Sequence, residues 1–402
     1  MGQVPPDHIL THEDASPRAD RAGGASGALR VVLAPNAFKG SLPAAGVAAA
    51  MAQGVRRVAA DAEIALAPMA DGGDGSVDAF VAAGYDRVPV VTRGPTGEPV
   101  GAAIAVLGRR AIVELASACG LALLPGGVPA PMTSTTLGLG DALLVALDLG
   151  CDDLVVCLGG SASTDGGTGL LVALGARLTD GRGATVPPGG AGLADIARLD
   201  LSRIDPRLAE ARVTVAADVT SPLCGPEGAA STFSPQKGAS PGQVAALDAG
   251  LARWARVLAE ATGRDVGAVP GAGAAGGTAA ALLATCAASI TPGARVVADL
   301  VGLDAHLATA DLVITGEGRL DRQSALGKAV VDVLARANAA GVPALAVCGR
   351  IDLATADLAA AGFAAWADCV TYAGSEAASI DRVRELVEQA TAAALRSWLA
   401  TR

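Results

Sequence analysis

Four strand ends or loops of this 402-residue sequence place an acidic side chain beside or close to glycine, or directly after an apolar run. The acidic residues of these loops are Asp71 and Asp74 in ADGGDGS, Asp165 in STDGG, Asp218 in ADVTSPL, and Glu317 and Asp321 in TGEGRLDRQS. Carboxylates in such loops bind divalent metal ions or accept a proton from a hydroxyl group. Because ligands of open α/β sheets collect outside the carboxyl ends of strands, we predict that these loops share one cleft. Asp and Gly also populate ordinary turns, so one such loop alone would mean little.

The loop at 159–167 carries the strongest signal. It follows an apolar run at 154–158 that predicts a buried strand, and it precedes leucines that repeat at helical spacing at 170–174. Its candidate ligand-binding residues are Gly159, Gly160, Ser161 and Ser163. Backbone N–H groups, hydroxyls and a helix N-terminus together favour a phosphate or a carboxylate. Asp165, in the same loop, is either a proton acceptor or simply the cap of the following helix.

Three lysines are candidates for contact with an anion. Lys39 follows the first predicted strand directly, in PNAFKGS. Lys328 opens a predicted helix, where the helix dipole would repel it unless a phosphate also binds there. Lys237, in SPQKGA, is either a third cation or a solvated loop lysine.

A glycine-rich stretch at 271–277 matches G-x-G-x-x-G, with glycines at Gly271, Gly273, Gly276 and Gly277. It follows AVP and not an apolar strand, which is the context that a dinucleotide-binding motif requires. A backbone nest for a phosphate group fits it better. The chain holds only three histidines, so a zinc site or a Ser-His-Asp mechanism has little to be built from.

The strands that must position these loops alternate with helices at the two ends of the chain. The predicted strands are 30–34, 64–68, 311–315, 343–348 and 367–371, with helices over 47–58 and near 330–334. Ser41 and Ser379 are the expected N-caps of the first and last helices. Neither end alone has enough strands to bury itself, so we predict one discontinuous, flavodoxin/Rossmann-like doubly wound α/β domain made of both.

The predicted domain boundaries follow from this pattern. Residues 29–68 and 301–402 form the Rossmann-like domain, and residues 69–300 form an inserted α/β domain, with the active site in the interdomain cleft. The inserted domain is expected to hold strands at 112–115, 154–158 and 213–217 and helices at 137–149 and 244–258. Residues 1–28 show no periodicity and are predicted to be a disordered extension.

Composition excludes several classes of partner. Thirty basic and forty acidic residues give a net charge of −10, and no Lys/Arg cluster is longer than a pair. We therefore expect no nucleic acid or anionic membrane as partner. The absence of a long apolar run and of a secretory pattern favours a cytoplasmic location. A homo-oligomer is possible.

Seven motifs, in this order, give the chain a resemblance to the glycerate kinase type 1 family. They are APNAFKGSL (34–42), PMADGGDGS (68–76), GGSASTDGG (159–167), ADVTSPL (217–223), FSPQKGA (233–239), GAGAAGG (271–277) and TGEGRLDRQSALGK (315–328). This chain has Asn36-Ala37 where the family usually has Asp-Ser, and Asp74 where Glu is usual. The resemblance implies an enzyme that phosphorylates D-glycerate with ATP and Mg²⁺ in a cleft between two α/β domains, with 2-phosphoglycerate preferred over 3-phosphoglycerate.

The resemblance also suggests roles for the candidate residues, because phosphoryl transfer needs charge neutralisation and an oriented hydroxyl. The residues expected to bind ATP are Gly271, Gly273, Gly276, Gly277, Gly316, Glu317, Gly318 and Lys328. Those expected to bind glycerate are Gly159, Gly160, Ser161, Ser163 and Asp74. Mg²⁺ is expected to be held by one or two of Asp71, Asp218 and Asp321. The expected catalytic residues are Lys39, Asp165 as proton acceptor, and Asp321.

Two other functions remain alternatives from the residues themselves. One is an NAD(P)-dependent dehydrogenase of a small hydroxy acid, against which the few histidines and the misplaced glycine motif argue. The other is a non-catalytic sensor of a sugar acid or nucleotide, which would need an effector surface. Incubation with ATP, Mg²⁺ and D-glycerate, followed by an assay for ADP, separates all three.

Overall fold

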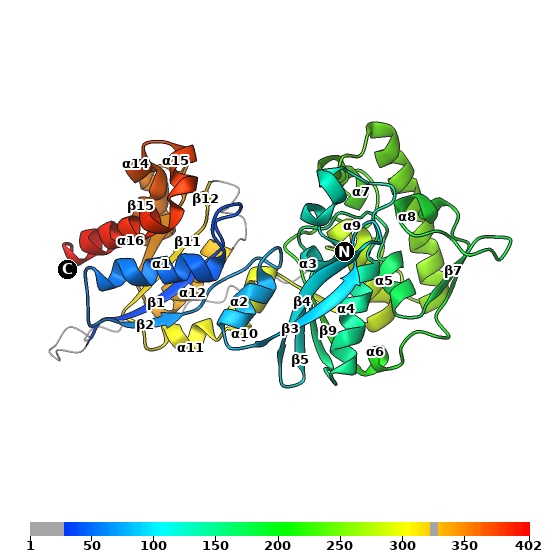
Figure 1. The fold of residues 1–402 in the computed structure, drawn as a ribbon, viewed down its shortest axis with the longest axis horizontal. Coiled ribbons are helices and arrows are strands. Elements are labelled where there is room, and N and C mark those ends of the chain that lie inside the picture. Colours follow the sequence, from blue (N-terminus) through cyan, green and yellow to red (C-terminus); the bar gives the residue numbers. More distant parts are fainter. Residues whose placement is uncertain (1–27, 322–328) are drawn as a thin grey trace, which may run out of the picture.

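A five-stranded parallel sheet brings the two ends of the chain together. The computed structural model describes residues 28–321 and 329–402. The strand order is β15-β13-β11-β1-β2, and all neighbouring pairs are parallel. The bounds are β1 (Arg30–Pro35), β2 (Glu63–Leu66), β11 (Leu312–Gly316), β13 (Ala344–Cys348) and β15 (Phe363–Asp368). This sheet confirms the predicted discontinuous doubly wound architecture (Figure 1).

Helices cover both faces of this sheet because successive strand residues point to opposite sides. Val31 and Leu33 of β1 pack with α1 (Ala44–Arg56) and α16 (Val383–Leu399) in one apolar cluster. Val32 and Ala34 belong to a second cluster on the other face. The helices of that second face are α10 (Gly293–Leu300), α11 (Leu303–Leu307), α12 (Ala329–Ala340) and α13 (Thr355–Ala361).

A six-stranded mixed sheet forms the core of the second lobe, in the order β10-β9-β6-β5-β4-β3. The strands β5 (Arg110–Glu114), β6 (Asp153–Cys157), β9 (Arg212–Ala216) and β10 (Ser289–Thr291) are parallel. The strands β3 (Asp86–Arg93) and β4 (Pro99–Leu107) form an antiparallel hairpin at one edge. The sequence analysis located β5, β6 and β9 and missed β3, β4 and β10.

One face of the six-stranded sheet carries most of the helices of this lobe. They are α3 (Leu115–Cys119), α4 (Leu137–Asp148), α5 (Thr168–Ala173), α7 (Ala229–Phe233), α8 (Pro241–Thr262) and α9 (Ala274–Cys286). The remaining short elements are α6 (Arg207–Glu210), β7 (Arg177–Thr179), β8 (Arg198–Asp200), α14 (Cys369–Ala373) and α15 (Glu376–Asp381), with β12 (Arg319–Leu320) paired to β14 (Arg350–Ile351).

Two helices lie between the sheets and join them. Figure 1 shows α2 (Ser76–Ala82) and α10 at the centre of the molecule, between the two lobes. Their buried residues share one apolar cluster with residues of both sheets, such as Val32 of β1 and Ile112 of β5. The predicted boundaries at 69 and 300 assign both helices to the inserted segment.

Several predicted details differ from the structure. Ser41 does not cap α1, which follows Pro43; its hydroxyl donates to the Phe38 carbonyl at 3.0 Å. Ser379 lies inside α15, and the cap of that helix is Ser375, whose hydroxyl accepts from Ala378 N at 3.3 Å. The last strand ends at Asp368, and 369–371 start α14 because Asp368 accepts from Thr371 N and caps a helix there.

Apart from residue 28, the predicted extension at 1–28 falls outside the described residues. Within the described ranges, no helix combines the length and the apolar character needed to cross a membrane.

Candidate functional site

Two cavities of similar size lie at the carboxyl ends of the two sheets. One, of about 310 Å³, is lined by residues that follow β1, β11 and β13, and we call it the switch-point cavity. The other, of about 320 Å³, is lined by residues that follow β2, β6 and β9, and we call it the glycine-loop cavity. Lys39 and Asp71 line both cavities. The two sites therefore adjoin each other at this pair of side chains.

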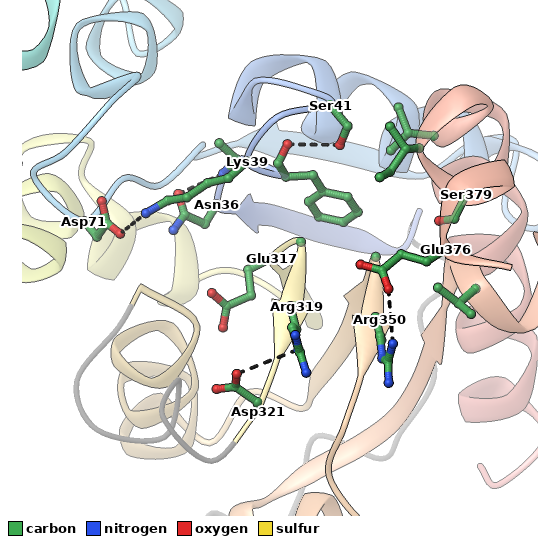
Figure 2. A pocket seen from close by; sticks show the side chains of 17 residues that line it. Asn36, Lys39, Ser41, Asp71, Glu317, Arg319, Asp321, Arg350, Glu376 and Ser379 are labelled. Atoms are coloured by element: carbon green, nitrogen blue, oxygen red, sulfur yellow. Dashed lines mark hydrogen bonds and ion pairs between the residues drawn. The ribbon is translucent and has the colours of Figure 1, made fainter. Parts of the chain in front are cut away.

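The switch-point cavity has the position that open α/β sheets use for ligands. The chain passes from β1 to β2 on one side and later adds β11 and β13 on the other, so the strand order reverses between β1 and β11. Ligands bind at such reversals, outside the carboxyl ends of the strands. Figure 2 shows Asn36 and Lys39 after β1, Glu317 after β11 and Arg350 after β13 around this cavity.

Two arginines in this cavity are held in place by one shared carboxylate. The Nε atoms of Arg319 and Arg350 each lie 2.6 Å from an oxygen of Asp352. Arg350 also reaches Glu376 at 3.2 Å. Guanidinium groups fixed in this way are well suited to phosphate oxygens, which they can contact through two N–H groups at once. The sequence analysis named neither arginine.

Lys39 and Asp71 form an ion pair where the two cavities meet. Lys39 Nζ lies 3.2 Å from Asp71 Oδ2. The lysine side chain is 71% exposed and the aspartate side chain 17% exposed. An exposed pair of this kind contributes little to stability. Lys39 can therefore leave Asp71 for an anionic ligand at small cost.

The glycine-loop cavity is built by close backbone contacts between its loops. Gly159 N donates to the Gly72 carbonyl at 2.9 Å, and a Cβ on Gly159 would stand 2.3 Å from the Cα of Gly73. Met69 N, at the start of the same acidic loop, donates to the Pro35 carbonyl of β1 at 2.8 Å. The ADGGDGS loop thus contacts both sheets, and glycine is required where it meets Gly159.

Asp218 and Asp71 face this cavity and influence each other. Asp218 Oδ1 accepts from Gly293 N at 2.7 Å. Burial raises the pKa of Asp218 to about 6, and the charge of Asp71 adds to the rise, while the Gly293 N–H opposes it. Asp321 lines the switch-point cavity instead, 3.9 Å from Arg319. Asp71 thus shares the glycine-loop cavity with Asp218 and the switch-point cavity with Asp321.

Asp165 is fully buried and lines neither cavity. Its Oδ2 accepts from Thr136 N and Thr136 Oγ1 at 2.9 Å each, from Gly169 N at 3.2 Å and from Thr135 Oγ1 at 3.3 Å. Its Oδ1 accepts from Gly167 N at 3.1 Å. This geometry disagrees with the predicted proton acceptor, because protein donors occupy both carboxylate oxygens and the residue is fully buried. It agrees with the plainer alternative, a carboxylate that anchors the start of α5.

The glycines at 271–277 do not join Glu317 and Gly318 at one triphosphate site. Gly276 lines the glycine-loop cavity, whereas Glu317 and Gly318 line the switch-point cavity. The other predicted ATP-binding glycines outside the cavities are explained by packing. A Cβ would stand 1.6 Å from Val347 O at Gly316, 2.3 Å from Pro222 O at Gly273, 2.6 Å from Leu223 Cδ1 at Gly277 and 2.9 Å from Ile290 Cδ1 at Gly271.

Lys237 is buried and lines the glycine-loop cavity, so it is not a solvated loop lysine. Its Nζ donates to Ser161 Oγ at 2.8 Å and to the Ser163 carbonyl at 2.5 Å. Burial lowers the pKa of Lys237 to about 7, and Asp165 partly offsets the effect. Of the residues expected to bind glycerate, Gly159, Gly160, Ser161 and Asp74 line this cavity, and Ser163 lies behind it. Lys328 falls outside the described residues.

Comparison with known proteins identifies the family. A family model described as "Glycerate kinase family" matches residues 31–399. This chain belongs to the glycerate kinase family. It is 41% identical to a protein of Escherichia coli K12 named glycerate 2-kinase, over 80% of this chain and 86% of that protein. It is 40% identical to a glycerate kinase of Halalkalibacterium halodurans, over 80% of this chain and 85% of that protein.

A solved structure shares the fold of this glycerate kinase family member. A crystal structure of a Salmonella typhimurium LT2 protein that carries the name glycerate kinase 2 aligns with a TM-score of 0.80 and 39% identity. The alignment covers 93% of this chain and 100% of that chain. The family membership inferred from the seven motifs is confirmed.

The structure adds residues that the motifs did not single out for this family member. Arg350 follows β13 in the same way that Lys39 follows β1, so its place after a predicted strand end was the available signal. Arg319 lies inside the last motif, between Glu317 and Asp321. The burial of Lys237 had no local signal, because the residues around it are polar or turn-forming.

Proposed function

We propose that this chain is an ATP-dependent kinase that transfers a phosphoryl group to a hydroxyl of D-glycerate. The observation that carries the proposal is the pair of adjoining cavities that share Lys39 and Asp71. Phosphoryl transfer needs a donor and an acceptor held against each other in a fixed geometry. The names of the relatives support glycerate as the acceptor, and the name glycerate 2-kinase supports 2-phosphoglycerate as the product.

We place the nucleotide in the switch-point cavity and glycerate in the glycine-loop cavity. The switch-point cavity combines two arginines for phosphate groups with apolar residues for a base, among them Val370, Ile380 and Val383. The glycine-loop cavity is lined largely by glycines and short side chains, which suits a small acid. The γ-phosphate would then meet the acceptor hydroxyl at the shared wall.

The side chains at the shared wall supply the chemistry. Lys39 moves from Asp71 to the transferring phosphoryl group and neutralises the charge that develops there. Asp71 orients the acceptor hydroxyl and accepts its proton, a role that replaces the one predicted for the buried Asp165. Asp71 and Asp218 line the same cavity and fit a divalent cation, because the charge of Asp71 disfavours the charged form of Asp218 until a cation binds.

Mg²⁺ would be held by Asp218 with Asp71 beside it, and when bound it offsets phosphate charge. Among the described residues, no group of three acidic, histidine or cysteine side chains is arranged to hold a metal. In kinases Mg²⁺ is usually held by one or two carboxylates together with the phosphates of the nucleotide. A cytoplasmic location, a possible homo-oligomer and the absence of nucleic-acid or membrane partners stay predictions.

The test is a direct assay of the purified protein. With ATP, Mg²⁺ and D-glycerate we expect ADP and one phosphoglycerate, and phosphorus NMR of the product distinguishes the 2- from the 3-isomer. L-Glycerate and D-lactate serve as controls for the acceptor. Formation of NADH from D-glycerate and NAD⁺ would support the dehydrogenase instead, and binding without turnover would support the sensor.

A further inference from the structure

The glycine-loop cavity contains a cation whose placement the proposed mechanism does not use. Lys237 is 3% exposed, whereas the Lys39 side chain is 71% exposed. Lysine is almost never fully buried unless it is paired with an opposite charge. The acceptors at 2.8 and 2.5 Å from its Nζ, a serine hydroxyl and a backbone carbonyl, are both neutral. An ammonium group has three donors, so one remains for a ligand.

The position of Lys237 is fixed by the fold around it. Ser234 begins the short turn that carries the lysine, and its buried hydroxyl lies 3.3 Å from Thr164 Oγ1 of the 159–167 loop. Lys237 N donates to the Ser234 carbonyl at 3.0 Å. Gly238 follows with a φ of +88°, and a Cβ there would stand 2.4 Å from the Cβ of Pro129. The chain therefore turns at a glycine position that directs Lys237 inward.

We infer that Lys237 is the specificity-determining cation of the glycine-loop cavity and that it binds the carboxylate of the acceptor. This inference rests on the proposed function, since it takes glycerate as the acceptor. A buried ammonium beside neutral partners is unfavourable until an anion reaches it. A carboxylate carries one charge and matches one buried lysine. Phosphate groups carry more charge, and the arginines that suit them line the other cavity.

The other charged side chains that line this cavity favour binding of the acceptor carboxylate next to Lys237. Asp71, Asp74 and Asp218 line the cavity together with Lys39, which is already paired with Asp71. The negative charge of Asp165 attracts the positive charge of Lys237 and favours the charged form of the lysine. A carboxylate would be repelled by the three aspartates and attracted by Lys237, next to the Ser161 hydroxyl that Lys237 contacts.

Proton uptake on binding follows from this arrangement. Burial disfavours the ammonium form of Lys237 and lowers its pKa to about 7. A carboxylate next to Nζ stabilises that form and raises the pKa. Above pH 7 the enzyme must therefore take up a proton when it binds glycerate. Because only the protonated form binds well, the KM for D-glycerate should rise about tenfold for each pH unit above 7.

The first experiment measures kcat and the KM for D-glycerate between pH 6.5 and 9, with saturating ATP and Mg²⁺. For the wild type we expect the KM to rise with pH while kcat changes less than about threefold. For Lys237→Met we expect a KM about 100-fold higher at pH 7 and independent of pH, as for loss of a buried charged hydrogen bond. Arg182→Met removes an exposed charge that does not line the cavity and should match the wild type.

The second experiment needs no variant. Calorimetric titration of D-glycerate into the wild type, with Mg²⁺ and a non-hydrolysable ATP analogue at pH 8, is run in two buffers that differ in ionisation enthalpy. We expect uptake of about 0.9 proton for each glycerate bound, since a group with a pKa near 7 is about 90% unprotonated at pH 8. A KM for Lys237→Met within threefold of the wild type overturns the inference, and an uptake near zero overturns the proton linkage.

The two proposals can fail separately. Turnover of D-glycerate by the wild type with a KM that Lys237→Met leaves within threefold refutes the role of Lys237 and leaves the kinase activity intact. A wild type that forms no ADP with D-glycerate refutes the proposed function, and the inference with it.

Discussion

Replacement of Asp165 by asparagine tests whether this carboxylate anchors the fold or accepts a proton. The best orientation of the new amide turns its oxygen toward the donors of Thr136 and Gly169, which now meet Oδ2. The amide NH₂ group then faces Gly167 N–H, where Oδ1 stands now. One buried donor loses its acceptor, the NH₂ group gains none there, and the remaining bonds lose their charge. We expect a loss of about 3 kcal/mol in the free energy of unfolding.

The assay combines urea denaturation with steady-state kinetics well below the unfolding transition. We expect Asp165→Asn to unfold at a lower urea concentration and to raise the KM for glycerate, because the 159–167 loop is held less firmly. Thr136→Val is the matched control: its hydroxyl donates to Asp165 Oδ2 and accepts from Leu170 N, yet it cannot act as a base. It should destabilise by about 1–2 kcal/mol in the same direction. A variant Asp165→Asn with wild-type stability and a kcat reduced 100-fold or more would refute the anchor role and restore the proton acceptor.

Three further predictions follow from the cavities. Lys39→Met should lower kcat by about 100-fold or more while the urea midpoint stays close to that of the wild type, because its ion pair is exposed; a normal kcat would exclude Lys39 from charge neutralisation. Arg350→Ala should raise the KM for ATP about tenfold and leave the KM for glycerate nearly unchanged, and the reverse pattern would exchange the ligands of the two cavities. As the pH is lowered at low Mg²⁺, activity should fall with a midpoint near pH 6, because Asp218 has a pKa of about 6 and takes up a proton there. Added Mg²⁺ should move this midpoint to lower pH, because the cation competes with the proton for Asp218. If Asp218→Asn keeps the same acid limb, another group titrates there.

The central strands β1, β11 and β13 were predictable because their sequences are short, continuous apolar runs. Leu312–Gly316 is buried throughout, as a central parallel strand must be. The β3–β4 hairpin was missed because its strands alternate apolar and exposed residues at a sheet edge and include Pro89, which weakens a strand pattern. An edge strand forms mainly because it pairs with the neighbouring strand, and the local sequence pattern does not show that pairing.

Site residues could be predicted from the sequence where they follow the end of a strand. They could not be predicted where their role depends on which way the side chain points from its loop. Asp71 and Asp218 were found because each follows the carboxyl end of a strand, β2 in one sheet and β9 in the other, and both line one cavity. Asp165 turns inward because of Thr135 and Thr136, about 30 residues earlier in the chain. Lys237 is buried by contact with Ser161, 76 residues away. Contacts between residues so far apart in the sequence determine which side of a loop faces the solvent, and a local sequence motif does not reveal them.

The central helices α2 and α10 couple the positions of the two lobes, because both helices pack in one apolar cluster with residues of both sheets. Asp71 lies in the loop that leads into α2, and Gly293, whose N–H holds Asp218, is the first residue of α10. A bulky substitution in this middle layer would therefore tilt one sheet against the other and shift two acidic side chains at once. Substitutions that change the preferred acceptor are therefore expected in the loops next to this layer and not in α2 or α10.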